Sequence, residues 1–260
     1  MTIKILWQRK KILVLENKIE QFVKILKESK NTVFFGGAGV STESGLKDFR
    51  SKDGLYNEKY DYPPEEILSH HFFIKHPAEF YKFYKDKLNS LTYHPNKAHY
   101  VLANLENKKL LKGIITQNID GFHQEAGSKN VVEIHGSVHR NYCLKCHKYY
   151  DAKKVFLSKG IPRCDCGGLI KPDVVLYEEP LKEQDVKKAI DLIKNAEVLI
   201  IGGTSLNVYP AASFISYFNG KHLIIINKDK TTMDNSCSLI FHDNIATVLE
   251  EVENKLKEEN

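Results

Sequence analysis

The sequence lacks any long uninterrupted apolar run. Charged residues break up the opening segment MTIKILWQRKKILVLENK, so it has no apolar core of about 7–15 residues such as a signal peptide needs. No other segment approaches the roughly 20 apolar residues of a membrane-spanning helix. The 260 residues are 42% hydrophobic and 27% charged, as is usual for globular proteins. We therefore expect a cytoplasmic protein with no membrane association.

Arginine is scarce. The 38 basic residues outnumber the 33 acidic ones and give a net charge of +5, yet the only arginines are Arg9, Arg50, Arg140 and Arg163. Proteins that read nucleic acids rely on the bidentate arginine fork, whereas here lysines are interleaved with glutamates along predicted helices. The positive charge therefore indicates a solvated surface, and we expect no nucleic-acid binding.

Cysteines are also few, but four of the five lie in two close pairs. Cys143 and Cys146 form the pair CLKC, and Cys164 and Cys166 form the pair CDC. In a reducing compartment this spacing is typical of a tetrahedral zinc site and not of disulfides. Four cysteine ligands leave no open position for a substrate, so we predict one structural Zn²⁺ per chain. His147 is an alternative ligand if the short CDC pair cannot close.

Short apolar runs rich in β-branched residues alternate with helical patterns along the chain. The runs are TVFFG, LLKGIIT, VVEI, EVLIIGG and HLIIIN. Continuous apolar strands are typical of a parallel sheet that is buried on both faces. We therefore predict an α/β fold with a Rossmann-like parallel sheet, helices on both of its faces, and a smaller domain made of a zinc-ribbon module and a helical insertion.

The predicted domain boundaries lie where the cysteine module and an aromatic helical segment interrupt the sheet pattern. The sheet domain is expected to comprise residues 14–50, 91–138 and 170–260, the small domain residues 51–90 and 139–169, and an N-terminal extension residues 1–13. The aromatic side chains of the insertion are expected to form the core of the helical module. The alternative is that some of them line an apolar channel.

Small or polar residues follow the carboxyl ends of the predicted strands, where an open parallel sheet binds its ligands. In GGAGVSTESG, glycines allow the backbone to approach a pyrophosphate, and the helix expected next would direct N–H groups at it. The dehydrogenase fingerprint G-x-G-x-x-G is absent, because Thr42 stands in place of its last glycine. GGTSLNVYP follows a later strand, and Asn227 ends HLIIIN, where it can hold a ribose hydroxyl. These strand ends predict dinucleotide binding.

Two further strand ends carry groups suited to acid–base chemistry. Gln117, Asn118 and Asp120 follow LLKGIIT, and His135 follows VVEI. Taken singly, each residue is better explained by structure alone, Asn118 or Asp120 as a helix cap and His135 as a hydrogen-bonded histidine at a strand end. Taken together, an imidazole, a carboxylate and two amides beside a dinucleotide favour proton transfer on a sugar over hydride transfer.

The motifs, in this order, resemble those of the sirtuins, the NAD-dependent protein lysine deacylases. The resemblance covers about residues 14–250 and rests on the cysteine pairs and on GAGVSTESGLKDFR, TQNIDGFHQEAG, EIHG, KPDVVLYEE and GTSLNVYP. It implies that the protein uses NAD as a co-substrate to remove acetyl or other acyl groups from lysine in proteins or peptides. The implied products are nicotinamide, free lysine and 2′-O-acyl-ADP-ribose.

The resemblance also implies roles for individual residues. His135 would be the general base, with Asn118 and Asp120 beside the nicotinamide, while Val175 and Tyr177 would contact the acyl-lysine peptide. Because the base must be neutral, activity is expected to fall as the pH drops through the ordinary imidazole pKa of ~6.5. The implied NAD site comprises Gly37, Ala38, Gly39, Ser41, Asp48, Phe49, Arg50, Gln117, Asn118, Asp120, Gly203, Thr204, Ser205 and Asn227.

Particular positions bear on substrate choice. Glu178 replaces the glycine of the family's F-G-E segment, so we expect a preference for basic residues flanking the lysine. Tyr84 stands where relatives that prefer succinyl or malonyl groups carry an arginine, so neutral acyl groups, acetyl first, are expected. We expect a monomer. The alternative functions are an NAD-dependent protein ADP-ribosyltransferase and a non-catalytic NAD sensor.

Overall fold

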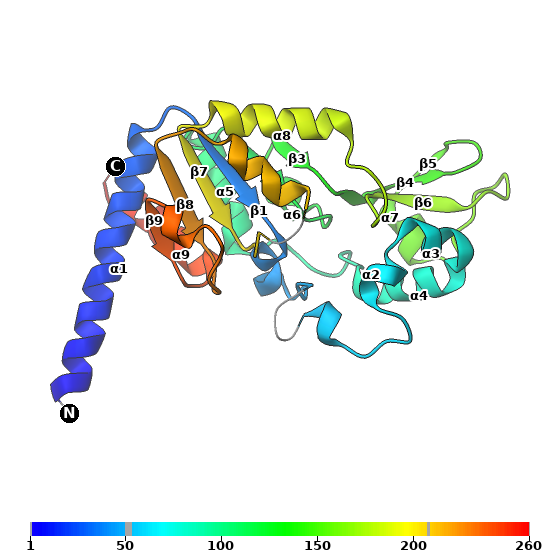
Figure 1. Ribbon diagram of the computed structural model, residues 1–260, viewed down its shortest axis with the longest axis horizontal. Coiled ribbons are helices and arrows are strands. Elements are labelled where there is room, and N and C mark those ends of the chain that lie inside the picture. Colours follow the sequence, from blue (N-terminus) through cyan, green and yellow to red (C-terminus); the bar gives the residue numbers. More distant parts are fainter. Residues whose placement is uncertain (1, 50–53, 207–208, 260) are drawn as a thin grey trace.

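The fold is given by a computed structural model, which describes residues 2–49, 54–206 and 209–259. Two sheets lie side by side along the length of the molecule, a large parallel one and a small antiparallel one (Figure 1). In the described part of the chain, none of the helices combines the length and the apolar character that crossing a membrane requires.

The large sheet contains six parallel strands in the order β3-β2-β1-β7-β8-β9. Their bounds are β1 Thr32–Gly36, β2 Gly113–Thr116, β3 Val131–Glu133, β7 Val198–Gly202, β8 His222–Ile226 and β9 Leu239–Phe241. The five apolar runs of the sequence are thus confirmed as strands. The sixth strand, β9, was not predicted, because it has only three residues and no recognisable pattern.

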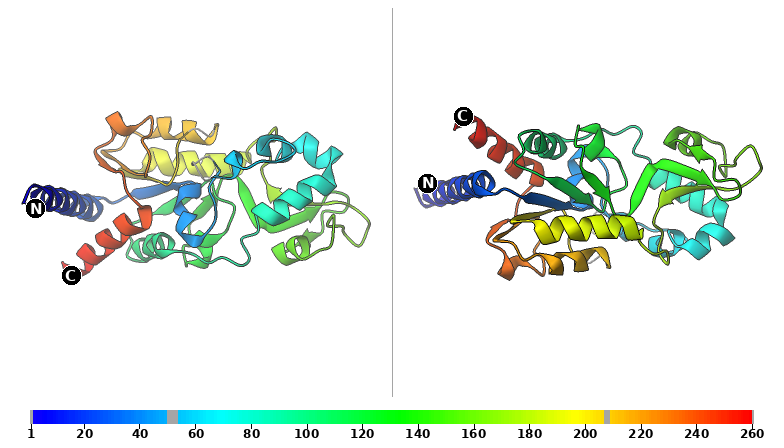
Figure 2. Two further views of the ribbon diagram at one scale, coloured as in Figure 1. Left: turned by 90° about the horizontal axis from the view of Figure 1, so that it is seen from below. Right: turned by 90° about the horizontal axis from the view of Figure 1, so that it is seen from above.

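Neighbouring residues of each strand face opposite helical layers. Phe34 of β1 belongs to an apolar cluster with three helices on one face, whereas Val33 and Phe35 belong to a cluster with α8 and the 3-10 helix η4 on the other (Figure 2). The predicted parallel α/β sheet with helices on both faces is confirmed. The helices of the two layers are α1 Thr2–Glu28, α5 Lys97–Asn107 and α9 Ile245–Glu258 on the first face, and α8 Glu183–Asn195 with η4 Ala211–Tyr217 on the second.

Helix α1 begins at Thr2, so it runs without interruption from the expected N-terminal extension of residues 1–13 into the sheet domain. Its apolar stripe is buried, with Phe22 and Leu26 fully inaccessible in the cluster that α1 shares with α9. The N-terminal part of the helix projects away from the sheet (Figure 1).

The small region is built on an antiparallel sheet in the order β5-β4-β6, with bounds β4 Gly136–Cys143, β5 Tyr149–Tyr150 and β6 Ile170–Val174. It therefore extends past residue 169. Short helices accompany it: α2 Pro64–Ile67, α3 His70–Lys75, α4 Pro77–Lys87 and α7 Ala152–Phe156. The aromatic cluster of the insertion is its buried core, as expected from the sequence, and consists of Phe72, Phe73, Phe80, Tyr81, Phe83 and Tyr84.

The strand order places a ligand crevice beside β1. The chain continues from β1 to β2 on one side, and later returns to β7 on the other side. In such sheets ligands bind outside the carboxyl ends of the strands where the direction of winding changes. Gly36 and Gly202, which end β1 and β7, are partners in the parallel register, so the crevice opens between two glycine-rich turns.

Candidate active site at the carboxyl ends of the strands

A cleft of ≈ 850 Å³ opens at the carboxyl ends of the large sheet and extends to the small region. It is lined by the predicted site residues that the structure describes, whereas Arg50 lies outside the described residues. Those lining residues are Gly37, Ala38, Gly39, Ser41, Asp48, Phe49, Gln117, Asn118, Asp120, His135, Val175, Tyr177, Gly203, Thr204, Ser205 and Asn227. None of the six aromatic side chains of the small region's core is among the cleft-lining residues of the described chain.

The two glycine-rich turns contact each other through their backbones. The N–H of Gly37 donates to the carbonyl of Gly202 at 3.2 Å, and that of Gly39 to the carbonyl of Gly203 at 2.8 Å. A Cβ atom on Gly39 would lie 2.8 Å from Gly203, and Gly203 has a φ of +59°, so both positions favour glycine. The two turns therefore form one wall of the cleft.

The segment after β1 differs from the prediction of a single helix. It forms two short 3-10 helices, η1 Ala38–Val40 and η2 Thr42–Ser44, which meet at Ser41. Ser41 has a ψ of 0°, and Gly45 ends the second helix in the left-handed conformation. The backbone therefore turns around the cleft wall, and the Ser41 side chain is buried beside it.

The turn after β2 is fixed to the wall of the cleft on both sides. Gln117 donates its N–H to the carbonyl of Gly36 at 2.9 Å and its side-chain amide to Thr204 Oγ1 at 3.0 Å. Gly121 adopts a φ of +78°, and a Cβ there would lie 2.6 Å from the His139 ring. His139 Nε2 donates to the carbonyl of Asp120 at 2.8 Å, so this turn has little freedom to move.

Ser41, Asn118 and Asp120 form a buried polar cluster in the cleft. Asn118 Nδ2 donates to Ser41 Oγ at 3.1 Å, and Ser41 Oγ donates to Asp120 Oδ2 at 2.7 Å. Asp120 Oδ1 also accepts the N–H of Phe122, the first residue of helix α6 Phe122–Glu125. Gly121 holds the N-cap position and no side chain caps this helix, so the capping interpretation of Asp120 is wrong; its carboxylate accepts one N–H at the start of the helix and lines the cleft. Burial raises the pKa of Asp120, while the hydrogen bonds from Phe122 and Ser41 lower it.

His135 presents one ring nitrogen as a possible base. Its Nδ1 lies 2.9 Å from the carbonyl oxygen of Gln117, and since a carbonyl can only accept, Nδ1 carries the proton. The lone pair is therefore on Nε2. Desolvation lowers the pKa of His135, partly offset by the hydrogen bond to Gln117. The expectation of an ordinary imidazole pKa was thus too high, because the sequence does not show how far the ring is buried.

The segment after β6 lies beside His135. Val175 donates its N–H to the carbonyl of His135 at 3.0 Å, and Tyr177 donates to the carbonyl of Leu68 at 3.0 Å. Glu178 has a φ of +74°, a conformation that favours glycine, and its carboxylate contacts His71 Nδ1 at 2.7 Å. The side chain that replaces the expected glycine is therefore held by hydrogen bonds to the ring and the backbone N–H of His71.

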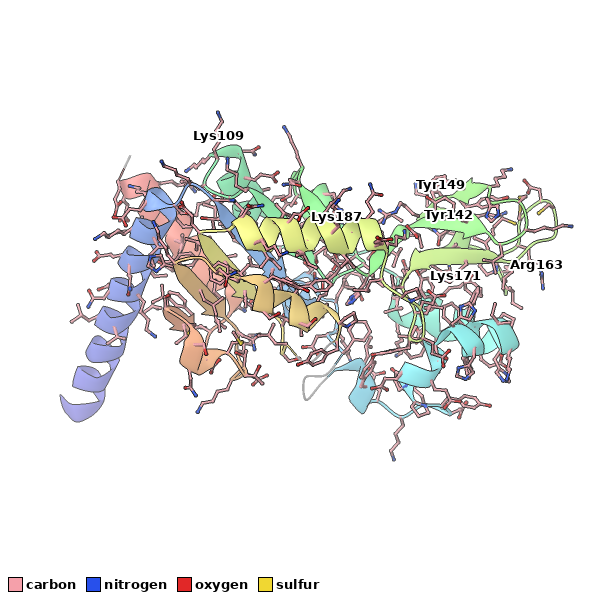
Figure 3. The ribbon with its side chains drawn as sticks, turned by 45° about the horizontal axis from the view of Figure 1, so that its top comes forward. Lys109, Tyr142, Tyr149, Arg163, Lys171 and Lys187 are labelled. Carbon is pink, nitrogen blue, oxygen red and sulfur yellow. The ribbon has the colours of Figure 1, made fainter. Side chains whose placement is uncertain are left out.

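The four paired cysteines converge at the far end of the small region. Their sulfur atoms all lie within 4.8 Å of one another, and the Cys143–Cys166 and Cys146–Cys164 pairs are 3.5 Å apart. A tetrahedral zinc–thiolate site requires sulfur separations of about 3.8 Å. The donor set therefore fits zinc. The CDC pair closes without His147, because Gly167 turns the chain at a φ of +78°. Arg163, next to Cys164, marks this tip in Figure 3.

Two histidines to which the sequence pattern assigns no role are fully buried near the cleft. His99 is the third residue of helix α5 and contacts Ser41, while His123 packs against His99 with their ring centroids 4.9 Å apart. The sequence carried one usable signal, since Asn96 and His99 have the spacing of a capping box.

Comparisons with known proteins agree with this geometry. The Sir2 family model matches residues 37–210. The NAD-dependent protein deacetylase of Clostridium perfringens (strain 13 / Type A) is 56% identical over 242 residues, which are 92% of this chain and 99% of that protein. A solved structure of Sir2 with a p53 peptide and NAD⁺ has a TM-score of 0.83 at 38% identity, covering 92% of this chain and 99% of that one.

A second solved structure contains Sir2 with an inhibitor, 2′-O-acetyl-ADP-ribose and a deacetylated p53 peptide. It has a TM-score of 0.81 at 37% identity and covers 92% of this chain and 99% of that one. The similarity therefore extends over both sheets and the cleft between them.

Proposed function

The chain belongs to the Sir2 family and is an NAD-dependent protein deacetylase, and from that premise we propose which of its residues act at each step. It binds acetylated peptide substrates and uses NAD as its co-substrate. The cleft beside β1 is large enough for a dinucleotide and one lysine side chain, since ligand sites commonly enclose about 300–1,000 Å³.

In this proposal the dinucleotide lies along the two glycine-rich turns. Gly37, Ala38 and Gly39 approach its phosphates, Ser205 and Asn227 hold a ribose, and Gln117 orients the other ribose. The implied NAD site also includes Asp48, Phe49, Arg50, Gly203 and Thr204. The close contact between the turns supports this assignment, because a Cβ atom on Gly39 or Gly203 would collide with the backbone of the other turn and displace the wall on which the phosphates would lie.

We assign the nicotinamide to the buried cluster of Ser41, Asn118 and Asp120. A carboxylate oxygen of Asp120 can accept a hydrogen bond from the carboxamide N–H₂ of the ring. The acetyl-lysine amide oxygen then attacks C1′ of the ribose, the C1′–nitrogen bond breaks, and nicotinamide leaves. Holding the leaving group in a buried pocket keeps bulk water away from the reacting carbon.

His135 completes the reaction as general base. Its Nε2 takes a proton from the ribose hydroxyls, and the 2′ oxygen captures the acetyl carbon. With the uptake of one water molecule, free lysine and 2′-O-acetyl-ADP-ribose are released. The observation that carries this role is the hydrogen bond from Nδ1 to the carbonyl of Gln117, which fixes the tautomer with Nε2 unprotonated. A sensor that only bound NAD would not need this base.

We propose that Val175 and Tyr177 contact the substrate peptide from the segment after β6, and that acetyl is the favoured acyl group. Tyr84 offers no cation at the position where the resemblance would require one for acidic acyl groups, although its side chain is buried in the core of the small region and not in the cleft lining. Cys143, Cys146, Cys164 and Cys166 would hold one Zn²⁺, which supplies a structural cross-link and no chemistry.

We further propose that the protein acts as a cytoplasmic monomer that does not bind nucleic acid. The four free thiols of the cysteine cluster suit a reducing compartment. We also propose a division into a sheet domain of residues 14–50, 91–138 and 170–260, a small domain of residues 51–90 and 139–169, and an extension of residues 1–13, with the boundary residues 136–138 and 170–174 assigned to the small domain because they belong to its antiparallel sheet. Separate apolar clusters in the two parts support this division.

Mass spectrometry of an acetyl-lysine peptide incubated with the protein tests the proposal. With NAD present, we expect deacetylated peptide and O-acetyl-ADP-ribose in equal amounts, and neither product without NAD. A succinyl-lysine peptide of the same sequence is the matched control and should react far more slowly. Consumption of NAD with the acetyl group left on the peptide would contradict deacetylation and favour ADP-ribosyl transfer.

A further inference from the structure

His99 is buried beside the nicotinamide pocket without lining the cleft itself. Its exposed fraction is 0%, and its Nδ1 accepts the backbone N–H of Asn96 at 3.2 Å as part of the capping box that begins helix α5. Because Nδ1 is an acceptor, the ring proton of neutral His99 must be on Nε2. Burial lowers the pKa of His99 to about 4, so the neutral form with this tautomer prevails at neutral pH.

The Nε2–H group of His99 is directed at Ser41. Nε2 lies 3.4 Å from Ser41 Oγ, which also receives a hydrogen bond from Asn118 Nδ2 at 3.1 Å. A serine hydroxyl has two lone pairs and one proton. With both lone pairs accepting, the proton of Ser41 is left for Asp120 Oδ2 at 2.7 Å. The start of helix α5 thus determines the direction of a hydroxyl group in the pocket.

His123 provides an internal comparison for this arrangement. Its ring is as buried as that of His99 and lies against Phe34, yet both of its nitrogens lack a hydrogen-bond partner among the described residues. His123 therefore fills space in the core. His99 differs in having a donor on one side and an acceptor on the other, and its contacts lead from a helix cap to the Asp120 carboxylate.

We propose that His99 is a positioning residue of the deacetylation reaction. It acts through Ser41: by donating to the serine hydroxyl it keeps the Ser41 O–H directed at Asp120 Oδ2, and so keeps that carboxylate aligned to accept the carboxamide N–H₂ of nicotinamide. The inference rests on the proposed placement of nicotinamide beside Ser41, Asn118 and Asp120. It concerns binding of the nicotinamide end of NAD and not binding of the peptide.

Two substitutions of His99 test the hydrogen bonds of Nδ1 and Nε2 separately. His99→Asn can replace the acceptor at Nδ1 and keep the helix cap, but it cannot reach Ser41. His99→Gln can place an amide N–H₂ near the former Nε2 position and donate to Ser41. We expect the Asn variant to weaken nicotinamide binding about tenfold, as loss of a buried hydrogen bond predicts. The Gln variant should stay within about threefold of wild type, since the donor to Ser41 is restored.

Nicotinamide affinity is read from product inhibition and from calorimetric titration, alongside KM for NAD and for the acetyl-lysine peptide. His99→Asn should weaken nicotinamide affinity and raise the KM for NAD, but leave the KM for the peptide unchanged. It should also nearly vanish in a Ser41→Ala background, because the contact acts through the hydroxyl. Thermal unfolding of each variant shows how far stability has changed.

Three results would overturn the inference. The first is an equal loss of affinity in the Asn and Gln variants, with nicotinamide and peptide binding weakened alike. The second is an Asn variant whose nicotinamide affinity equals that of wild type. The third is that the effects of His99→Asn and Ser41→Ala on nicotinamide affinity add in full. The wild-type reaction is read separately. If wild type forms no O-acetyl-ADP-ribose, the proposed function fails, and the calorimetric titration of nicotinamide still decides the role of His99.

Discussion

The two sheets keep their shape by different means. Strands β1, β2 and β7 are buried along their whole length between two apolar layers. The small sheet has one apolar cluster, one strand of only two residues, and the cysteine cluster at its far end. Yet it delivers two cleft segments, because β4 begins directly after His135 and β6 ends directly before Val175. The proposed NAD wall therefore depends on apolar burial, whereas the base and the peptide segment adjoin the metal-dependent part.

Removal of zinc should produce the largest difference in behaviour between the two regions. Structural zinc sites carry apparent binding free energies of about 10–16 kcal/mol. Chelation or Cys164→Ser should remove this stabilisation from the small sheet. We expect deacetylation to stop and hydrogen exchange to rise across residues 136–174, while β7 and β8 stay protected. Cys237→Ser is the matched control, since this cysteine lies outside the cluster. A parallel rise in β7 and β8 would show that the regions are not independent.

Substitution of His135 tests the boundary between the two regions. His135→Ala should lower the deacetylation rate ~10²–10⁴-fold, the usual contribution of a general base, while NAD binding is retained. Because burial lowers the pKa of His135, the acidic fall in wild-type activity should be centred below pH 6.5. Rate–pH profiles and calorimetry with NAD measure both effects. The control is His94→Ala, an exposed ring outside the cleft, and an active His135→Ala enzyme would exclude the proposed base.

The large region should lose stability at acid pH. His99 is neutral in the folded state with a pKa of about 4, whereas the unfolded chain takes up a proton near pH 6.5. The stabilisation is therefore complete above pH 6.5 and is lost as the pH falls to about 4. This one group accounts for a loss of about 2–3 kcal/mol in the free energy of unfolding.

Urea unfolding at pH 7, 5 and 4 measures this loss. His99→Gln, which cannot titrate, should lose less stability than wild type between pH 7 and pH 4, and His94→Gln should behave like wild type. Identical pH dependence in wild type and His99→Gln would contradict the assignment.

The smallest effect is expected at the peptide groove. Glu178→Gly removes a carboxylate and permits the left-handed backbone at this position, so the variant should fold at least as well as wild type. Any preference for basic residues flanking the acetyl-lysine should fall by a fewfold, as expected for one exposed charge. The ratio of kcat/KM for basic-flanked and acidic-flanked peptides measures it. Equal ratios in both proteins would exclude a role for Glu178 in specificity.

Most of the sheet could be predicted because buried parallel strands are continuous apolar runs, and their polar ends necessarily gather at one edge. That argument places Gln117, Asn118 and His135 beside the glycine-rich turns before any coordinates are known. The two 3-10 helices could not be predicted, since they depend on the backbone angles at Ser41 and Gly45. Nor could the burial of His99, because its surroundings come from segments distant in the sequence.

The pairing of β1 with β7 also orders events during synthesis of the chain. Thr32 is a register partner of Val198, and one wall of the cleft is formed by the turns that follow these two strands. A nascent chain that has not yet emerged as far as β7 lacks the neighbour that completes the centre of the sheet. Closing so long a stretch of chain is slow, because its entropy must be lost before the contact forms. An emerging polypeptide should therefore become competent for NAD only after most of its length has left the ribosome.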